Sequence, residues 1–287
     1  MSAVGDLLLG ERLRATGFIV TIYGDVAEPR GGRLWMGTLI GICGLVGISE
    51  TLLRTAVSRL VAAGRLEGAR DGRRSHYRLT EAARREFAAA AARIFAAAEP
   101  PGRWLLAGAA ADGGAADAAA ELAAAGFQPV GDGLWLGVER PGMPPPAAAA
   151  FTLRAEPATG AEAFRRFAAE RWRLAAHAAA YATFCAQFAP LATALAAGEA
   201  LDGAASLVAR LLLVHRYRTV ALDDPHLPLE VLGPDWPGER AHALFAGLYC
   251  RLSPAADAFV ATAFAADGPL PAETEGTRRR LHALAAG

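Results

Sequence analysis

The spacing of apolar residues near the start of the chain predicts two helices. From Thr16 to Val26 the apolar residues recur at helical spacing, namely at Phe18, Ile19, Ile22, Tyr23 and Val26. A cluster of Pro29, Gly31 and Gly32 then breaks the pattern. A second apolar run, from about Trp35 to Gly44, predicts the second helix.

A third helix is predicted to begin after Ser49, which is a favourable N-cap, with Glu50 near the positive end of the helix dipole. Its apolar residues would face a core and are Leu53, Ala56, Val57, Leu60 and Val61. The opposite face is short and polar, with Thr51, Arg54, Thr55 and Ser58. Gly64 is a natural end for this helix.

A hairpin is predicted directly after this helix. Two short strand patterns, Leu66–Arg70 and Arg73–Leu79, are joined by Asp71-Gly72, a strong turn signal. Within the second strand the alternation predicts that one edge packs, with Ser75, Tyr77 and Leu79, while the other presents Arg74, His76 and Arg78. Three helices followed by such a hairpin predict a winged helix-turn-helix.

The basic residues of this region indicate DNA binding rather than a plain solvated surface. Planar guanidinium groups suit phosphate oxygens, and four arginines crowd the hairpin with only Asp71 opposing them. Residues 1–98 hold 14 arginines against 9 acids, a net charge of +5, whereas residues 99–287 carry −5. The predicted DNA contacts are Ser49, Thr51, Arg54, Thr55, Ser58 and Arg59 on the helix and Arg70, Arg73, Arg74, His76 and Arg78 on the wing.

Residues 81–98 read as an alanine-rich linker helix, and we expect a domain boundary near Glu99. The next segment predicts a small ferredoxin-like unit, because strand and helix patterns alternate at 103–109, 115–125, 127–130, 134–139, 151–155 and 160–172. The remainder is mostly helical, with segments predicted at 174–188, 190–197, 201–220, 236–252 and from Ser253-Pro254 through Phe264. The sequence thus predicts an α+β multidomain protein with domains at 1–98, 99–173 and 174–287.

Two segments resemble the PaaX family of repressors, which regulate bacterial phenylacetic acid degradation. Residues 16–80, with TGFIVTIYGD at their start, look like the N-terminal domain of that family, and residues 210–254, with their VH-x-YR run and DWPG turn, resemble its C-terminal region. The resemblance implies a homodimeric repressor that binds a palindromic operator and is released by an aryl-CoA thioester, typically phenylacetyl-CoA. It also implies a dimerisation role for the middle domain.

Such a ligand needs arginines for its phosphates and aromatic walls for its aryl group, so the predicted effector residues are Arg210, His215, Arg218, Trp172 and Trp236. A structural alternative stays open for each of them. In that alternative the arginines Arg210, Arg216 and Arg218 pair with Asp223, Asp224 or Glu230, while His215 and Trp236 merely pack.

An enzyme is the other class of function considered, as a hydrolase or nuclease acting on a CoA thioester or a nucleic acid. We expect neither catalysis nor a metal site, because no GxSxG, HExxH or Walker motif occurs and Asp112 has no second acid at useful spacing. Cys43, Cys185 and Cys250 lie far apart, which favours buried thiols. We expect a cytoplasmic protein, since charge, Gly or Pro is expected to interrupt every apolar stretch before it could span a membrane and the N-terminus lacks a signal peptide pattern.

Overall fold

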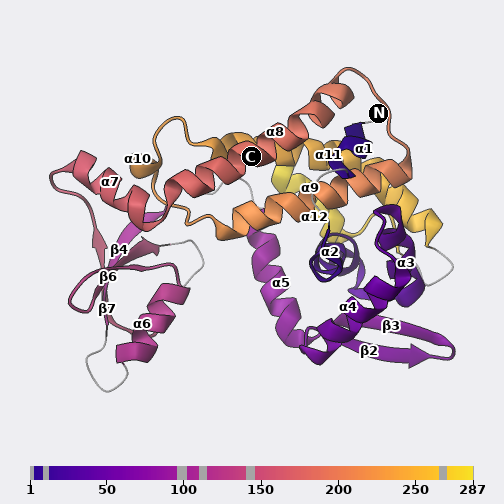
Figure 1. Ribbon diagram of the computed structural model, residues 1–287, viewed down its shortest axis with the longest axis horizontal. Coiled ribbons are helices and arrows are strands. Elements are labelled where there is room, and N and C mark those ends of the chain that lie inside the picture. The colour runs from indigo at the N-terminus through magenta and orange to yellow at the C-terminus, as the bar shows by residue number, and fades with distance from the viewer. Residues whose placement is uncertain are drawn as a thin grey trace. The chain divides into compact units, whose positions relative to one another are not determined.

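The computed structural model describes residues 3–8, 13–95, 102–109, 115–139, 146–264 and 270–286. The contacts divide the chain into two compact units. Unit 1 comprises residues 1–98, 182–222 and 239–287, and unit 2 comprises residues 99–181 and 223–238. Each unit contains one small antiparallel sheet together with helices (Figure 1), so the predicted α+β class is confirmed at that level.

The described N-terminal part of unit 1 holds four helices, a three-stranded sheet and a following helix. Its elements are α1 (Ala3–Leu8), α2 (Ala15–Ile22), the π-helical turn η1 (Tyr23–Ala27), the 3-10 turn η2 (Glu28–Arg30), β1 (Arg33–Trp35), α3 (Met36–Leu45), α4 (Glu50–Ala62), β2 (Leu66–Asp71), β3 (Arg74–Leu79) and α5 (Glu81–Ile94). The predicted helices and hairpin are therefore present. The core between them includes Phe18, Ile22, Leu39, Leu53 and Leu60.

Two details of this region differ from the sequence prediction. The hairpin loop is Gly72-Arg73 rather than Asp71-Gly72, because Asp71 still pairs with Arg74 across the ladder. Gly72 has φ +59°, a value that glycine adopts without steric cost. In addition, Arg33–Trp35 forms the edge strand β1, which makes β3 the central strand of the sheet order β1-β3-β2.

Two helices in the C-terminal half of the chain are longer than the sequence pattern predicts. Helix α8 (Leu174–Ala196) continues through Pro190, and α11 (Pro237–Ala263) continues through Pro254, so the predicted helix breaks at both prolines are wrong. Burial of Phe188, Leu191 and Leu252 close to these prolines supplies packing that outweighs the helix cost of the ring. The other long helices are α9 (Gly203–Asp223) and α12 (Glu275–Ala285).

Helix α8 also corrects the expectation about apolar stretches. Among the described residues, Leu174–Ala196 is long enough and apolar enough to cross a membrane. It carries no Asp, Glu, Lys or Arg. This is weak support for a span, because the core helix of a soluble protein passes the same test.

Unit 2 is built on a four-stranded sheet in the order β5-β6-β4-β7. Its elements are β4 (Arg103–Ala109), α6 (Ala115–Ala124), β5 (Gln128–Gly131), β6 (Leu134–Glu139), β7 (Ala149–Ala155), α7 (Ala161–Arg171) and the short helix α10 (Leu229–Leu232). The strands and helices predicted between 103 and 172 are confirmed, with ends shifted by a few residues at most.

The two faces of this sheet pack against different helices. On one face Leu105 and Ala107 pack with Leu122 of α6 and with Phe127. On the other face Trp104 and Leu136 pack with Ala168 of α7 and with Trp172. The two helices therefore cover opposite faces.

In the C-terminal half of the chain, the boundaries of the two units differ from those of the three predicted domains. Residues 182–222 and 239–287 group with residues 1–98 instead of forming a domain of their own. The predicted boundary near residue 99 lies outside the described residues, which leave out 96–101.

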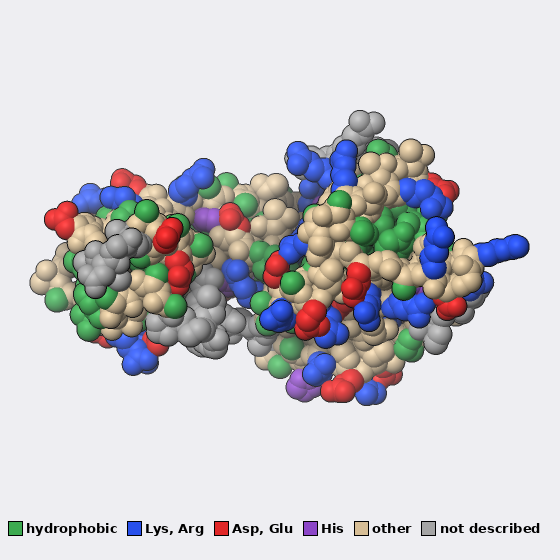
Figure 2. All heavy atoms as spheres, turned by 90° about the horizontal axis from the view of Figure 1, so that it is seen from below, with side chains coloured by type: hydrophobic (Ala, Val, Ile, Leu, Met, Phe, Trp, Pro, Cys, Tyr) green, Lys and Arg blue, Asp and Glu red, His purple; other side chains and the backbone are tan. Residues whose placement is uncertain are grey.

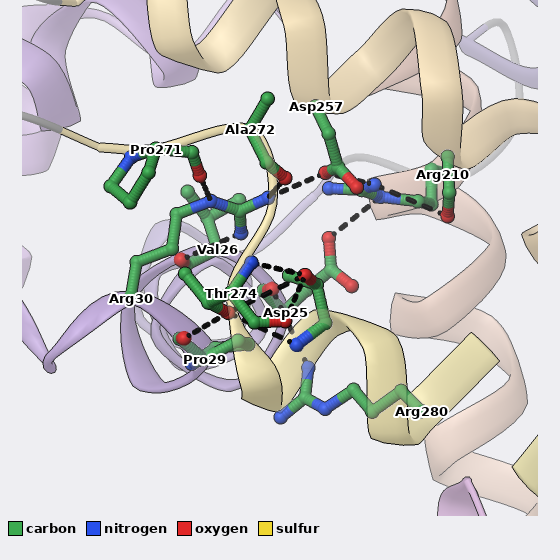
Figure 3. A network of polar contacts seen from close by, with 12 residues as sticks. Asp25, Val26, Pro29, Arg30, Arg210, Asp257, Pro271, Ala272, Thr274 and Arg280 are labelled. Carbon is green, nitrogen blue, oxygen red and sulfur yellow. Dashed lines mark hydrogen bonds and ion pairs between the residues drawn. The ribbon is translucent and has the colours of Figure 1, made fainter. Parts of the chain in front are cut away.

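A buried ionic network joins the N-terminal elements of unit 1 to its C-terminal helices (Figure 3). Arg210 of α9 is 1% exposed and donates to Asp25 of η1 at 3.0 Å and to Asp257 of α11 at 2.6 Å. Arg30 of η2 binds the same oxygen of Asp257 at 2.6 Å. Tyr249 donates to Asp25 at 2.9 Å. Two arginines thus balance two carboxylates in the core.

The charge of Arg210 is held by its neighbours. Burial acts to lower its pKa, but Asp25, Tyr249 and Asp257 outweigh that effect and the pKa is raised. An ion pair of this kind is costly to break, since removing one partner leaves a buried charge without compensation.

A second polar contact joins α9 to α2. The Nδ1 atom of His215 lies 2.8 Å from the hydroxyl of Thr21, and its ring packs against Phe18. Arg218 donates to the carbonyl of Gly17 at 3.1 Å. Burial, followed by the charges of Arg218 and Arg216, lowers the pKa of His215 to about 4.

We predict that Arg210→Met destabilises the protein by about 3–5 kcal/mol, because it leaves Asp25 and Asp257 buried with too few cations. The matched control is Arg84→Met, which removes an exposed pair with Glu81 and should cost less than about 1 kcal/mol. Urea unfolding followed by circular dichroism gives both values. Equal losses for the two variants would contradict a structural role for the network.

The depressed pKa of His215 predicts acid sensitivity. The unfolded side chain binds its proton near pH 6.5, whereas the folded one does so only near pH 4. The contribution of neutral His215 to the free energy of unfolding is therefore complete above about pH 6.5. It is lost as the pH falls toward 4, by no more than about 1.4 kcal/mol per pH unit.

We expect His215→Gln to flatten the decline in unfolding free energy between pH 6.5 and 4, as measured by urea titrations at several pH values. The control is His282→Gln, at an exposed position of α12, which should keep the wild-type slope. An unchanged slope in His215→Gln would show that His215 is not the group responsible.

Candidate nucleic-acid interface

Helix α4 presents a continuous polar face. The hydroxyl of Ser49 caps the helix by accepting from the amide of Leu52 at 3.4 Å, which confirms the predicted start. Four of the five residues predicted to face the core are buried, namely Leu53, Ala56, Val57 and Leu60. The prediction is wrong for Val61, which is 40% exposed and lines the groove beside the hairpin. The predicted contact residues of the helix, namely Ser49, Thr51, Arg54, Thr55, Ser58 and Arg59, are all exposed.

A groove of about 450 Å³ separates α4 from the hairpin. Arg54 and Ser58 line it from the helix, and Arg70 and Ser75 line it from the strands. Arg54 is held by an exposed ion pair with Glu50 one helical turn earlier, at 2.7 Å. Exposed pairs of this kind are weak, so Arg54 can exchange Glu50 for another acceptor at low cost.

The hairpin arginines lie on two faces of the sheet. Arg70 is directly opposite Ser75 and faces the groove, whereas Arg74 and Arg78 belong to the other face by strand alternation. Arg74 lies over the ring of Trp35 at 5.3 Å, and Arg78 pairs with Glu67 at 2.7 Å. Figure 2 looks from below in the orientation of Figure 1, and arginines and acids are interspersed on the part of that face formed by unit 1.

Arg59, Arg70 and Arg73 have no hydrogen bond or ion pair to any residue that the structure describes. Their guanidinium groups are exposed, so they need give up no protein partner before binding an anion. Planar guanidinium groups of this kind suit phosphate oxygens.

His76 corrects the predicted alternation of the wing. It was expected to be presented beside Arg74 and Arg78, but it is only 8% exposed. The cause is the edge strand β1, which places Trp35 opposite His76 on one side, while Ala69 lies opposite it on the other. The sequence pattern alone gave no sign of that third strand.

The predicted effector residues belong to two different units. Trp172 and Trp236 belong to unit 2, where Trp172 donates to the carbonyl of Gly126 at 3.1 Å and Trp236 packs edge-on against Tyr181. Arg210, His215 and Arg218 belong to unit 1 and contact the elements described above. Their role in ligand binding stays a prediction.

Arg210 does form structural ion pairs, as the alternative to a ligand-binding role predicts, but its partners are not the predicted Asp223, Asp224 or Glu230. Arg210 pairs with Asp25 and Asp257, which lie far from it in sequence. Glu230 instead accepts from the indole of Trp104 at 2.7 Å. The sequence did carry a signal for Asp25, because an acid inside the apolar run FIVTIYGDVA must be buried with a partner.

Within the described residues, no group of three or more His, Cys, Asp or Glu side chains is placed to hold a metal ion. Asp112, the acid considered for a nuclease site, lies outside the described residues.

Comparisons with known proteins agree with the two segments singled out above. The family model for PaaX-like protein matches residues 14–83, and the model for the PaaX-like protein C-terminal domain matches residues 172–262. The chain is 33% identical to the transcriptional repressor PaaX of Escherichia coli (strain K12), over 85% of this chain and 82% of that protein. The solved structure of the uncharacterized protein Rv0674 from Mycobacterium tuberculosis is similar, with 25% identity, a TM-score of 0.50 and coverage of 86% of this chain and 99% of the other. The chain therefore belongs to the PaaX-like protein family.

Proposed function

We propose that this protein is a DNA-binding transcriptional repressor, and that residues 15–79 form its winged helix-turn-helix. In this proposal α4 is the recognition helix and the β2–β3 hairpin is the wing. The observation that carries the proposal is the exposed polar face of α4, which adjoins a groove lined by Arg54, Ser58 and Arg70. The relative named as a transcriptional repressor supports the same function.

The residues of the recognition helix and the arginines of the wing have different roles in this proposal. Arg54, Thr55 and Ser58 contact base edges, because they project from the middle of the recognition helix. The wing arginines Arg70, Arg73, Arg74 and Arg78 contact phosphates or the minor groove, which contributes affinity without sequence preference.

We further propose that residues 99–173, which belong to unit 2, form a ferredoxin-like domain and make the dimer contact. The strand order β5-β6-β4-β7 supports that assignment, although its two helices cover opposite faces of the sheet, which departs from the usual arrangement. Part of the sheet carries exposed apolar side chains, since Phe151 of β7 is 49% exposed and Leu153 is 55% exposed. Both lie on the same face, opposite Gly108 and Leu106 of β4. Apolar sheet surface of this kind is typical of a protein interface.

The biological setting follows from the family. We propose a cytoplasmic regulator of an aromatic catabolic operon, with phenylacetate as the pathway substrate and an aryl-CoA such as phenylacetyl-CoA as the releasing effector. We propose no catalytic role, and no observation on the described residues favours the hydrolase or nuclease alternative.

The division of roles predicts different effects for two arginines. Arg54→Ala should lower the preference for operator over random DNA, because a bidentate contact to guanine is worth about 1–3 kcal/mol of discrimination. Arg74→Ala should weaken binding to both DNAs alike and reduce the salt dependence. Gel-shift titrations with both DNAs at two salt concentrations measure this.

The control for both variants is Arg166→Ala, at an exposed position of α7 outside the candidate interface, and it should bind both DNAs like the wild type. If Arg54→Ala and Arg74→Ala both lost affinity for operator and for random DNA to the same extent, α4 would not be the recognition helix.

The dimer proposal predicts that Leu153→Lys yields a monomer. A charge placed in an apolar interface must lose its water, and a monomer contacts only one half-site, so operator affinity should fall by about tenfold or more. Sedimentation equilibrium and footprinting follow the two effects. The matched control is Leu229→Lys, at a leucine that is 47% exposed on α10, which should stay dimeric. A wild-type monomer that protects one unrepeated site would rule out the proposal.

A further inference from the structure

Unit 1 contains an apolar cavity that the candidate DNA interface does not use. Its volume is about 220 Å³, and it lies between α5, α2 with η1, and α9. Phe87 and Ile94 of α5 line it on one side, and Val214 and Leu222 of α9 on the other. Most of its lining is hydrocarbon, which suits an aryl or acyl group.

One polar group in this lining lacks a partner. Arg218 lines the cavity, and one of its terminal nitrogens donates to the carbonyl of Gly17. Its Nε atom is buried and has no hydrogen-bond partner among the described residues. A buried donor without an acceptor is costly, so an oxygen atom of a ligand would stabilise it.

A second and larger cavity abuts the first. Its volume is about 730 Å³, and it shares the lining residues Gly24, Phe87, Ala91 and Phe95 with the apolar cavity. Its remaining wall includes Ala88 and Ala92 of α5, together with residues of η2 and α12 that contribute polar side chains.

The larger cavity has a cationic side. Arg280 lies over the ring of Phe95 at 4.3 Å, and Arg279 lines the same space with an exposed guanidinium group. Two acids, Glu28 and Glu275, also line it, and Glu275 is only 3.8 Å from Arg279 in an exposed, weak pair. An anionic group of a ligand can therefore take over Arg279 at low cost.

We propose that the two cavities form one ligand site, which takes an aryl or acyl group with a carbonyl or carboxylate oxygen in the inner cavity and an anionic tail in the outer one. This rests on the proposed repressor function, whose effector it would bind. The inner oxygen accepts from Arg218, and Arg279 and Arg280 hold the tail. A thioester of a phosphorylated carrier has all three features, whereas a free aryl acid has only the first two.

The position of the site explains how a ligand could alter DNA binding. Helix α5 begins at the residue after Thr80, directly after the wing strand β3, and Glu86 of α5 pairs at 2.5 Å with Arg65, which lies in the short connection between α4 and β2. Arg65 and Glu86 also line the inner cavity. A ligand that binds more tightly when α5 is displaced therefore shifts the recognition helix and the wing together.

Cavity-filling variants test the site directly. We expect wild-type protein to bind phenylacetyl-CoA in calorimetry, and Ala91→Leu, which occupies both cavities, to weaken that binding by at least about tenfold. The matched control is Ala89→Leu, on the exposed face of the same helix and in neither cavity, which should bind like the wild type. Operator binding without ligand checks that both variants are folded.

A surface variant tests the outer part of the site should Ala91→Leu fail to fold. Arg279→Gln should weaken the binding of phenylacetyl-CoA several-fold and leave the weaker binding of phenylacetate unchanged. The control is Arg278→Gln, on the same helix but outside the cavity, which should change the binding of neither compound. Binding of phenylacetyl-CoA that is insensitive to both Ala91→Leu and Arg279→Gln would overturn the proposed site. Absence of acyl-CoA binding to the wild type would also overturn it, while intact operator binding would leave the repressor function standing.

Discussion

The pairing of Arg210 with Asp25 and Asp257 is the constraint on which the rest of unit 1 depends. A single guanidinium group connects the π-helical turn that follows α2 with helix α9 and helix α11. Because these charges are buried, each is tolerable only while the others are in place. The turns that carry Asp25 and Arg30 therefore cannot move away from α9 and α11 without breaking buried ion pairs. The network thus fixes segments from both ends of the chain within one unit.

The elements closest to the DNA interface could be predicted from sequence because their signals are local. The cap at Ser49, the apolar spacing of α4 and the alternation of the hairpin each depend on residues within one or two turns of one another. The prediction was wrong wherever a distant contact decided the outcome. The edge strand β1 buried His76, and burial in the C-terminal bundle carried α8 and α11 through their prolines.

The candidate sites show the same division. The exposed residues of α4 and the wing were identified from their types and spacing, and all except His76 are exposed. Three of the predicted effector residues, Arg210, His215 and Arg218, follow one another closely in sequence, but the fold gives the two arginines different surroundings. Arg210 is enclosed by carboxylates, whereas Arg218 lines a cavity whose other walls come from α2 and α5. No sequence pattern could indicate that cavity, because its lining comes from helices far apart in the chain.

The sequence separation within the ionic network also constrains synthesis of the protein. Asp25 and Arg210 are 185 residues apart, and Arg210 and Asp257 are a further 47 apart. At translation rates of about 5–20 residues per second, Asp25 waits roughly 10–40 s for its first buried partner. A nascent chain would therefore hold the turns that carry Asp25 and Arg30 without their buried partners until α11 has left the ribosome. The packing of the N-terminal elements against α9 and α11 is thus one of the last steps of folding during synthesis.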